Sequence, residues 1–336
     1  MIDQFKRHRI LEMLRVLTPP SMFILSTFFG RVRTFDTEAV KIDVKQNKRA
    51  LAPFVSPLQA GFHVERDGYV TKTFEPAYVK PLAKFTPSDL FKRQAGQALE
   101  SQSTTIDDLI AEELMDQQET VTRREEWMAI QALLNGTVSV VGEGVNAVVD
   151  FLRPASHTIT LTGADQWSDP SANPIADIKA WRSLILQDSG RRADTVVLDP
   201  ESAEAFINHP NVIDKLDTRR VELGQFMPRE LDEQVTYLGD LFSGAVSIFS
   251  YEEFYHDGTT DQPMMPSGRV IIGASGARSE RLYGAIQDFD AGGLAEARWF
   301  PKVWMEKDPS VANLLLQSAP LPSPVEVNAY ASATVL

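Results

Sequence analysis

The sequence predicts an α+β protein, and three observations carry this prediction. Residues 104–135 have the pattern of one long helix. The Asp67-Gly68 pair separates two strand-like runs, which is typical of a β-hairpin. After residue 160, short helical patterns alternate irregularly with strand-like runs, which favours a small mixed domain. The length of 336 residues with 43% hydrophobic residues is ordinary for a folded protein of about two domains.

Composition excludes several classes of protein. The chain has no cysteine, so it holds no disulfide, no thiolate nucleophile and no cysteine-based zinc site. No apolar run approaches the ~18 residues that a membrane-spanning helix needs. The start, MIDQFKRHRI, lacks the layout of a signal peptide. We therefore expect neither secretion nor membrane insertion.

Charge is unevenly distributed along the chain. The net charge is -13, but residues 1–50 carry ten Lys and Arg against five acids, a local +5. The remaining residues therefore carry about -18. We expect residues 1–50 to form an N-terminal arm that is solvated, pairs with neighbouring copies or touches nucleic acid. The acidic remainder disfavours tight binding of DNA, because phosphate contacts dominate such affinity.

Residues 51–100 are predicted to form a projecting hairpin. Asp67-Gly68 lies between Phe62–Arg66 and Tyr69–Phe74, and both central residues of such a turn need positive φ. The flanking residues are too polar to build a core, so the hairpin should lean on something else. The alternative is an ordinary surface hairpin within one subunit.

The predicted long helix has start and stop signals. Thr104 or Thr105 can cap its beginning, and Asn135-Gly136 supplies the stop. Residues 104–119 contain six acids and no base, which indicates either a solvated face or a face toward a basic partner. The apolar stripe consists of Ile106, Ile110, Leu114, Val121 and Met128.

The rest of the chain alternates strands and helices. Residues 137–151 are strand-rich around a Gly-Glu-Gly turn, and Asn173-Pro174 should begin a helix that ends at Gly190. Thr195–Leu198 should be a buried strand, and Asp199-Pro200 should begin another helix. Further strand-like runs are Ala245–Ser250, Arg269–Gly273, Arg281–Gln287, Trp299–Met305 and Val325–Ala331.

Patterns of catalytic chemistry are missing from the sequence. No two of the five histidines lie within five residues of each other, so no histidine-based metal motif exists. The stretch 273–278 contains glycine but matches neither the Walker lysine pattern nor the GxGxxG pattern of phosphate-binding loops. No GxSxG nucleophile elbow occurs in the sequence. A hydrolase is the enzymatic alternative. Acid pairs such as Asp288 with Asp290 could catalyse hydrolysis only if their carboxylates shared a pocket. We predict no catalytic, cofactor-binding or metal-binding residue.

The run from Tyr283 to Leu321 is the most distinctive part of the chain. Together with other pieces in the same order, it resembles the major capsid proteins of phage lambda and related tailed phages, the lambda major head protein E family. The resemblance runs from about Phe28 to the C-terminus. The matching pieces are VSP (Val55–Pro57), FEPAYVKP (Phe74–Pro81), KLDTRR (Lys215–Arg220), GASGARSERLYGAIQD (Gly273–Asp288), ARWFPKVW (Ala297–Trp304), DPS (Asp308–Ser310) and QSAPL (Gln317–Leu321).

This resemblance implies the Hong Kong 97-type phage capsid fold. The parts it implies are an N-terminal arm (1–50), an extended β-hairpin loop (51–100), a peripheral domain (101–160 and 270–310) with a spine helix (104–135), and an axial domain (161–269 and 311–336). The run from Tyr283 would then cross from the peripheral sheet into the axial domain, with Trp299, Phe300 and Trp304 as core or subunit-contact residues.

The resemblance also implies a structural function. The chain is expected to assemble into hexamers and pentamers of an icosahedral shell around double-stranded DNA. Its expected partners are other copies of itself, a portal protein, a cement or decoration protein and DNA bound non-specifically. A separate scaffolding protein is expected as well, since the arm of residues 1–50 is too short to hold a helical scaffolding segment. The expected location is the virion, with assembly in the host cytoplasm and no membrane. An encapsulin-like nanocompartment is the alternative.

Three groups of residues are the candidates for assembly contacts. The first is the hairpin tip with its flanks, the second the base of the loop, and the third a set of acids on the spine helix. They are Arg66, Asp67, Gly68, Tyr69 and Lys72; Tyr78 and Lys80; and Asp107, Asp108, Glu112, Glu113 and Asp116.

Overall fold

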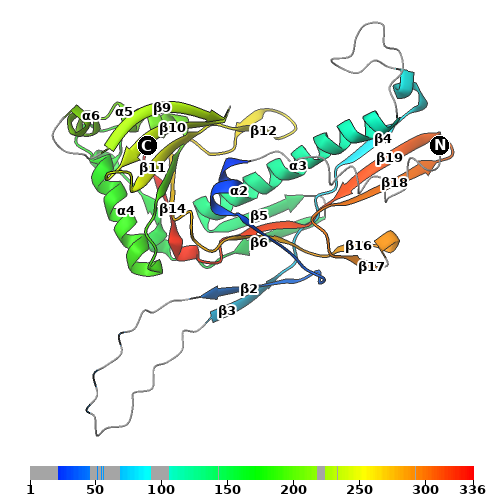
Figure 1. Ribbon diagram of the computed structural model, residues 1–336, viewed down its shortest axis with the longest axis horizontal. Coiled ribbons are helices and arrows are strands. Elements are labelled where there is room, and N and C mark those ends of the chain that lie inside the picture. Colours follow the sequence, from blue (N-terminus) through cyan, green and yellow to red (C-terminus); the bar gives the residue numbers. More distant parts are fainter. Residues whose placement is uncertain are drawn as a thin grey trace.

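The computed structural model mixes helices and strands, and the α+β prediction is confirmed (Figure 1). It describes residues 22–45, 51, 54, 56, 69–91, 106–142, 144–217, 224–232, 234–291 and 293–336.

A single long helix, α3 (Ile106–Asn135, 30 residues), runs through the middle of the molecule (Figure 1). At 1.5 Å per residue its length is about 45 Å. The predicted apolar stripe is buried at Ile110, Leu114, Val121 and Met128. Gly136 follows the helix with a φ of 69°, as the stop signal predicted. The proposed caps Thr104 and Thr105 lie outside the described residues.

Small sheets pack around α3. Strands β5 (Thr137–Gly142) and β6 (Val145–Asp150) pair antiparallel up to Gly142↔Val145 and lie against the helix, and β19 (Val311–Gln317) places Leu314 and Leu316 beside Leu114 and Val121. The small sheets follow the orders β5-β6, β18-β19-β4 and β1-β15-β20. Their strands are β5 (Thr137–Gly142), β6 (Val145–Asp150), β18 (Phe300–Glu306), β19 (Val311–Gln317), β4 (Leu82–Phe85), β1 (Arg31–Thr34), β15 (Glu280–Tyr283) and β20 (Pro320–Ser323).

A seven-stranded sheet forms the other part of the molecule, at the left in Figure 1. Its order is β7-β21-β14-β8-β11-β10-β9. The strands are β7 (Thr158–Thr160), β21 (Tyr330–Thr334), β14 (Arg269–Gly273), β8 (Thr195–Leu198), β11 (Val246–Tyr251), β10 (Val235–Leu241) and β9 (Gly224–Asp232). The predicted strand Thr195–Leu198 is the central β8, and it is fully buried.

Three helices accompany this sheet: α4 (Pro174–Ser189), α5 (Pro200–Ile207) and α6 (Pro210–Asp217). The predicted caps are confirmed, because the side chain of Asn173 accepts from Ala176 N and that of Asp199 from Glu201 N. Gly190 ends α4 in the left-handed conformation. The core between α4 and the sheet includes Trp167 and Trp181, whose rings stack at 5.9 Å.

Residues 22–34 are built into the body rather than set apart from it. The short helix α2 (Phe23–Phe28) buries Ile24, Leu25 and Phe28, and β1 pairs with β15. Strand β2 (Val40–Lys45) pairs antiparallel with β3 (Tyr69–Phe74), and this ladder projects from the body (Figure 1). The predicted strand Phe62–Arg66, its turn at Asp67-Gly68 and the remainder of the arm lie outside the described residues.

Two other short hairpins complete the fold, and two predicted strands need correction. The hairpins are β12 (Phe254–His256) with β13 (Asp261–Pro263), and β16 (Ile286–Asp288) with β17 (Gly293–Ala295). The run Arg281–Gln287 was wrong as one strand: it divides into β15 and β16, because the amides of Gly284 and Ala285 bond to Ala319 and Thr37. The run Val325–Ala331 was also wrong as one strand, since Val327–Ala329 is a 3-10 helix ahead of β21.

The run from Tyr283 to Leu321 contributes strands to several small sheets. Strands β18 and β19 pair with each other from Phe300↔Gln317 to Glu306↔Val311. The boundary expected at residue 310 therefore falls in the turn between two paired strands. The division of the chain into arm, loop, peripheral and axial domains stays a prediction.

Candidate assembly surfaces

Lys72 connects the projecting ladder to the body. Its Nζ lies 3.1 Å from the carbonyl oxygen of Asp150 and 3.5 Å from Oδ2 of the same residue. Both side chains are partly exposed, so the ion pair adds little stability by itself. The contact joins β3 to Asp150 at the end of β6. Tyr69 stands at the far end of the ladder, where it pairs with Lys45, and Arg66, Asp67 and Gly68 lie outside the described residues.

Tyr78 fixes the end of the segment that follows β3. Its hydroxyl donates to the carbonyl of Ala285 at 3.1 Å and accepts from the amide of Gln287 at 3.0 Å. The neighbouring Val79 forms a two-bond bridge with Ser318. Lys80 is exposed, with its Nζ 4.4 Å from the centre of the Tyr78 ring. The base of the loop is therefore anchored to the chain's own body.

The acids of α3 differ in their surroundings. Glu112 and Asp116 are exposed, and Glu113 is half-buried. Gln117 Nε2 bridges Glu113 Oε1 at 3.3 Å and the carbonyl of Leu314 at 3.2 Å. Burial raises the pKa of Glu113, with smaller contributions from the like charges of Asp116 and Glu112. For Asp107 and Asp108 the structure gives only their place in the first turn of α3.

Two buried glutamates in the middle of α3 were not predicted. Glu125 Oε2 accepts from the hydroxyl of Tyr283 at 2.8 Å and from Arg298 Nη2 at 3.2 Å. The Arg298 guanidinium also lies 4.1 Å from the centre of the Trp299 ring. Burial raises the pKa of Glu125, against the opposing charge of Arg298 and the hydrogen bond from Tyr283.

Glu126, the next residue, forms hydrogen bonds to other segments of the chain than Glu125 does. Its carboxylate accepts from the amides of Ile24 (2.8 Å) and Leu25 (2.9 Å), and from the Tyr251 hydroxyl at 3.3 Å. Burial raises its pKa to about 7. The two glutamates thus join α3 to α2, to the seven-stranded sheet and to the Tyr283 run.

The C-terminal end of α3 is held by two arginines. Arg153 donates to the carbonyls of Leu133 and Leu134, and Arg269 donates to Leu134 at 3.2 Å. Positive charge at this end is favourable because the last carbonyls of a helix are partly negative. Burial lowers the pKa of Arg153 to about 10, and the neighbouring charge of Arg269 contributes. Ser332 of β21 donates to the same Leu134 carbonyl at 2.6 Å, which joins the helix to the sheet.

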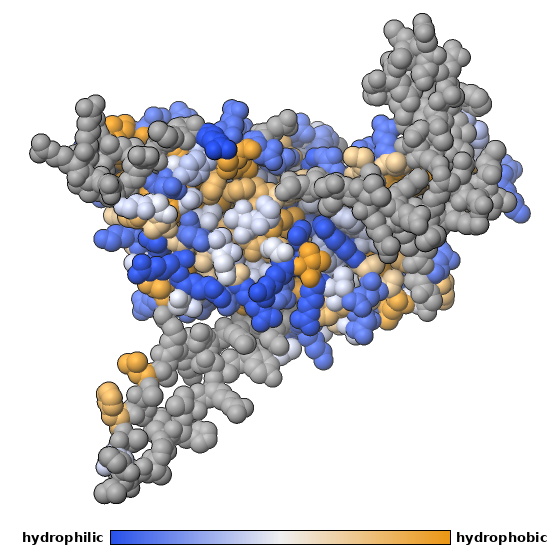
Figure 2. All heavy atoms as spheres, in the orientation of Figure 1, coloured by the Kyte–Doolittle hydropathy of each residue, from blue (hydrophilic) through white to orange (hydrophobic). Residues whose placement is uncertain are grey.

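Over the visible face of the body, hydrophilic side chains predominate and hydrophobic ones form small groups between them (Figure 2). Large exposed hydrophobic residues include Phe254, Phe289, Met305 and three valines of the β5–β6 hairpin. Within the described ranges, no group of His, Asp or Glu is arranged to hold a metal ion, and no helix is long and apolar enough to cross a membrane.

Comparison with known proteins identifies a matching family. The family model described as phage major capsid protein E matches residues 7–335. The major capsid protein of Escherichia phage lambda is 31% identical over 309 residues, which is 88% of this chain and 89% of that protein.

Solved structures share the fold. A structure assigned as a prophage capsid protein of E. coli CFT073 superposes with a TM-score of 0.75 at 19% identity, covering 98% of this chain and 99% of the other. An encapsulin from Synechococcus elongatus gives a TM-score of 0.50 at 11% identity, covering 96% and 94%. At these identities the two likenesses concern the fold alone.

Proposed function

The chain belongs to the phage major capsid protein E family, and from this premise we propose how its surfaces build the shell. Its function is that of a major capsid protein: a structural subunit of a phage virion that associates with copies of itself into an icosahedral shell, and not an enzyme. It has the Hong Kong 97-type capsid fold. The match over nearly the whole chain carries this conclusion.

We propose that the copies assemble as hexamers and pentamers, and that the β2–β3 ladder leads the loop onto a neighbouring subunit. The ladder is rooted at one end, where Val40 is buried and pairs with the half-buried Phe74. From there it projects to the pair Lys45↔Tyr69. A two-stranded ladder is marginal by itself in water. A neighbouring surface under it would supply the missing burial and enlarge the interface.

In this proposal the base of the loop has a supporting role. Tyr78 and Val79 are bonded to the body of their own chain, so they set the direction of the loop. The exposed Lys80 and the flanking Lys72 remain candidates for contacts to the neighbour. Arg66, Asp67, Gly68 and Tyr69, next to the outer end of the ladder, are also proposed to contact the neighbour.

The acids of α3 are proposed to receive a basic segment of another copy. Asp107, Asp108, Glu112, Glu113 and Asp116 lie within the first eleven residues of the helix. The local +5 of residues 1–50 is the complementary charge.

We propose further partners from the membership of the family. These are a portal protein, a separate scaffolding protein, a cement or decoration protein and non-specifically held double-stranded DNA, with assembly in the host cytoplasm.

A loop replacement tests the proposal. Residues 46–68 are replaced by Asn-Gly, which joins the paired ends Lys45 and Tyr69 through a two-residue turn and keeps the β2–β3 ladder. The wild type should form shells in negative-stain micrographs. The variant should have the same unfolding midpoint as unassembled wild type and should form no shells.

Normal shells from the variant would contradict the role of the loop and leave the capsid function intact. A wild-type protein that stays a monomer under every assembly condition would contradict the capsid function itself.

A further inference from the structure

A single aromatic side chain stands fully exposed at the tip of the β16–β17 hairpin. Phe289 has 99% of its surface accessible, in a short 3-10 turn between the two strands. In Figure 1 this hairpin projects from the body below β18 and β19. We name Asp288, Phe289 and Asp290 the Phe289 knob. An aromatic ring left in water is a typical anchor for an interface.

The knob is braced from within its own chain. Lys302 Nζ lies 2.9 Å from Asp288 Oδ1 and 2.8 Å from Asp290 Oδ2. Asp288 also accepts from the amide of Asp290 at 2.9 Å and from Gln317 Nε2 at 2.9 Å. Because the turn is fixed, covering Phe289 would cost little ordering of the chain. The brace also directs the knob outward.

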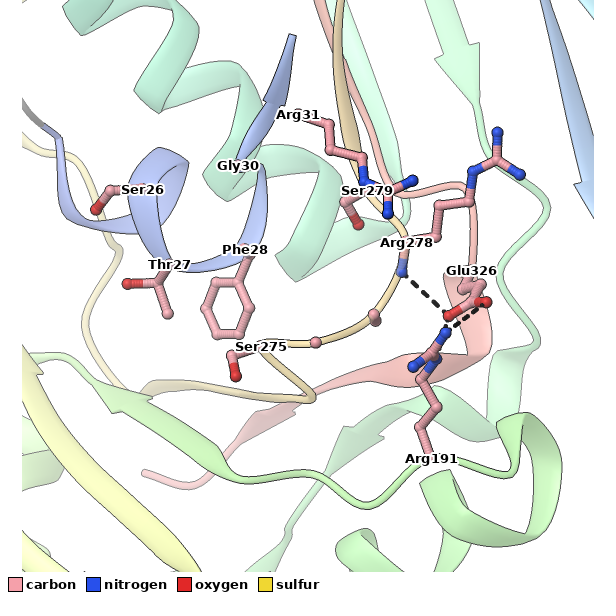
Figure 3. Close-up of a pocket in the computed structure, with 12 residues that line it drawn as sticks. Ser26, Thr27, Phe28, Gly30, Arg31, Arg191, Ser275, Arg278, Ser279 and Glu326 are labelled. Carbon is pink, nitrogen blue, oxygen red and sulfur yellow. Dashed lines mark hydrogen bonds and ion pairs between the residues drawn. The ribbon is translucent and has the colours of Figure 1, made fainter.

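A pocket with complementary chemistry lies elsewhere on the molecule. It has a volume of about 400 Å³ and is bordered by α2, the start of β1 and the loop before β15 (Figure 3). Phe28 and Ala277 lie behind its wall and are nearly inaccessible, so the accessible lining is mainly polar. Three arginines line it: Arg31, Arg191 and Arg278.

The arginines are held in different ways. Arg191 is paired with Glu326, and the backbone of Arg278 donates to the same carboxylate at 3.1 Å (Figure 3). Arg278 Nε also lies 3.0 Å from Glu280 Oε1. Arg31 is exposed at the edge of the pocket. The pocket therefore combines a fixed wall with an accessible guanidinium.

We propose that the Phe289 knob of one copy inserts into this arginine-lined pocket of the neighbouring copy. The aromatic ring would lie against guanidinium groups, an arrangement that this fold already uses where Arg298 covers Trp299 at 4.1 Å and Arg33 covers Phe35 at 4.8 Å. Asp290, 59% exposed, would face Arg31. Opposite charge at the rim would orient the insertion.

The symmetry of this contact suits a ring of subunits. The knob and the pocket are different surfaces of one chain, so their contact is heterologous and repeats from copy to copy until the ring closes. The inference rests on the proposed assembly into hexamers and pentamers, and it adds the residues that join neighbours.

Disulfide trapping tests the contact directly, because the chain has no cysteine of its own. The variant Arg31→Cys/Asp290→Cys places the two thiols at the residues proposed to face each other, one at the pocket and one on the knob, and keeps Phe289. Assembled particles are oxidised and run on a non-reducing denaturing gel. A ladder from dimers up to pentamers and hexamers is expected, while each single-cysteine variant should stay monomeric on the gel, because a heterologous contact brings no two identical residues together. Shells that give no ladder would overturn the inference.

Removing the anchor gives an independent measurement. Phe289→Ala should raise the protein concentration needed for assembly about tenfold or more, whereas Phe289→Tyr should assemble nearly normally. The unfolding midpoint of the unassembled chain should not change in either variant. Normal assembly by Phe289→Ala would overturn the inference and leave the capsid function standing, while a wild type without shells would contradict that function.

Discussion

Glu126 Oε1 lies 2.8 Å from the amide nitrogen of Ile24, a residue 102 positions earlier in the chain. The contact caps α2 from outside, because the N-cap residue Met22 has no side-chain oxygen with which to do so. The carboxylate is wholly buried in α3. A buried acid thus fixes the N-terminal segment on the spine of the body.

Glu126 should make the stability of the unassembled subunit depend on pH. Burial raises its folded-state pKa to about 7 from the usual 4.5, so the folded chain holds a proton that the unfolded chain has lost. The free energy of unfolding should therefore fall as pH rises from 4.5 through 7, by at most about 3 kcal/mol from this group. Urea unfolding at pH 5, 6, 7 and 8 measures the slope.

The variant Glu126→Gln isolates this effect. It cannot titrate, so the difference in slope between it and the wild type belongs to Glu126. At pH 5 the variant should be about 1 kcal/mol less stable, because an amide NH2 cannot accept from Leu25 as the carboxyl oxygen does. Parallel slopes in the two proteins would contradict the prediction.

Arg298 should be needed because it is the ion-pair partner of a buried carboxylate. Glu125 is 1% exposed, and its carboxylate accepts hydrogen bonds from Tyr283 and Arg298. When Arg298 is replaced by alanine, only the bond from the Tyr283 hydroxyl remains of these two. An uncompensated buried charge costs about 3 kcal/mol. Denaturant unfolding of Arg298→Ala should show a loss of that size at pH 8. Adding Glu125→Gln should recover part of it, since the neutral amide no longer needs a cation. A double variant as unstable as the sum of the two single variants would contradict the pairing.

Elements with local signals were predictable from the sequence. The caps at Asn173 and Asp199 and the stop at Gly190 each depend on residues within one turn of the helix end. The apolar stripe of α3 is likewise a property of one segment. Such features need no knowledge of distant contacts.

The buried glutamates and the partner of β3 were not predictable in this way. Glu125 and Glu126 look like the other acids of a charged helix until Ile24, Tyr283 and Arg298 are brought beside them. Two buried acids next to tyrosine or arginine in space leave no spacing signal in the sequence. Strand β3 pairs with residues 40–45, across more than twenty residues, and local alternation does not specify such a partner.

Two glycines with positive φ should differ in what a side chain costs. Gly136 (φ 69°) and Gly144 (φ 76°) both follow regular structure, but a Cβ on Gly136 would lie 2.7 Å from Cβ of Arg153, whereas open space surrounds Gly144. Gly144→Ala should cost about 1 kcal/mol from backbone strain alone. Gly136→Ala should cost about 2 kcal/mol more, because Arg153 must move away from the carbonyls that it caps. Thermal unfolding compares the two, and equal losses would contradict the crowding at Gly136.

The exposed acids of α3 should matter for assembly and not for folding. Glu112 and Asp116 are exposed on the helix, so Glu112→Lys/Asp116→Lys should change the free energy of unfolding by less than about 0.5 kcal/mol.

If these acids receive a basic segment of another copy, the double reversal places like charges in contact and should raise the concentration needed for shell formation about tenfold. Light scattering of assembling subunits measures that concentration. Glu204→Lys, an exposed acid on α5, controls for a general effect of added positive charge. Because surface ion pairs are screened, the defect of the double variant should shrink as salt rises. Assembly that is equally impaired in the control, or unchanged in the double variant, would contradict the role of the acidic face.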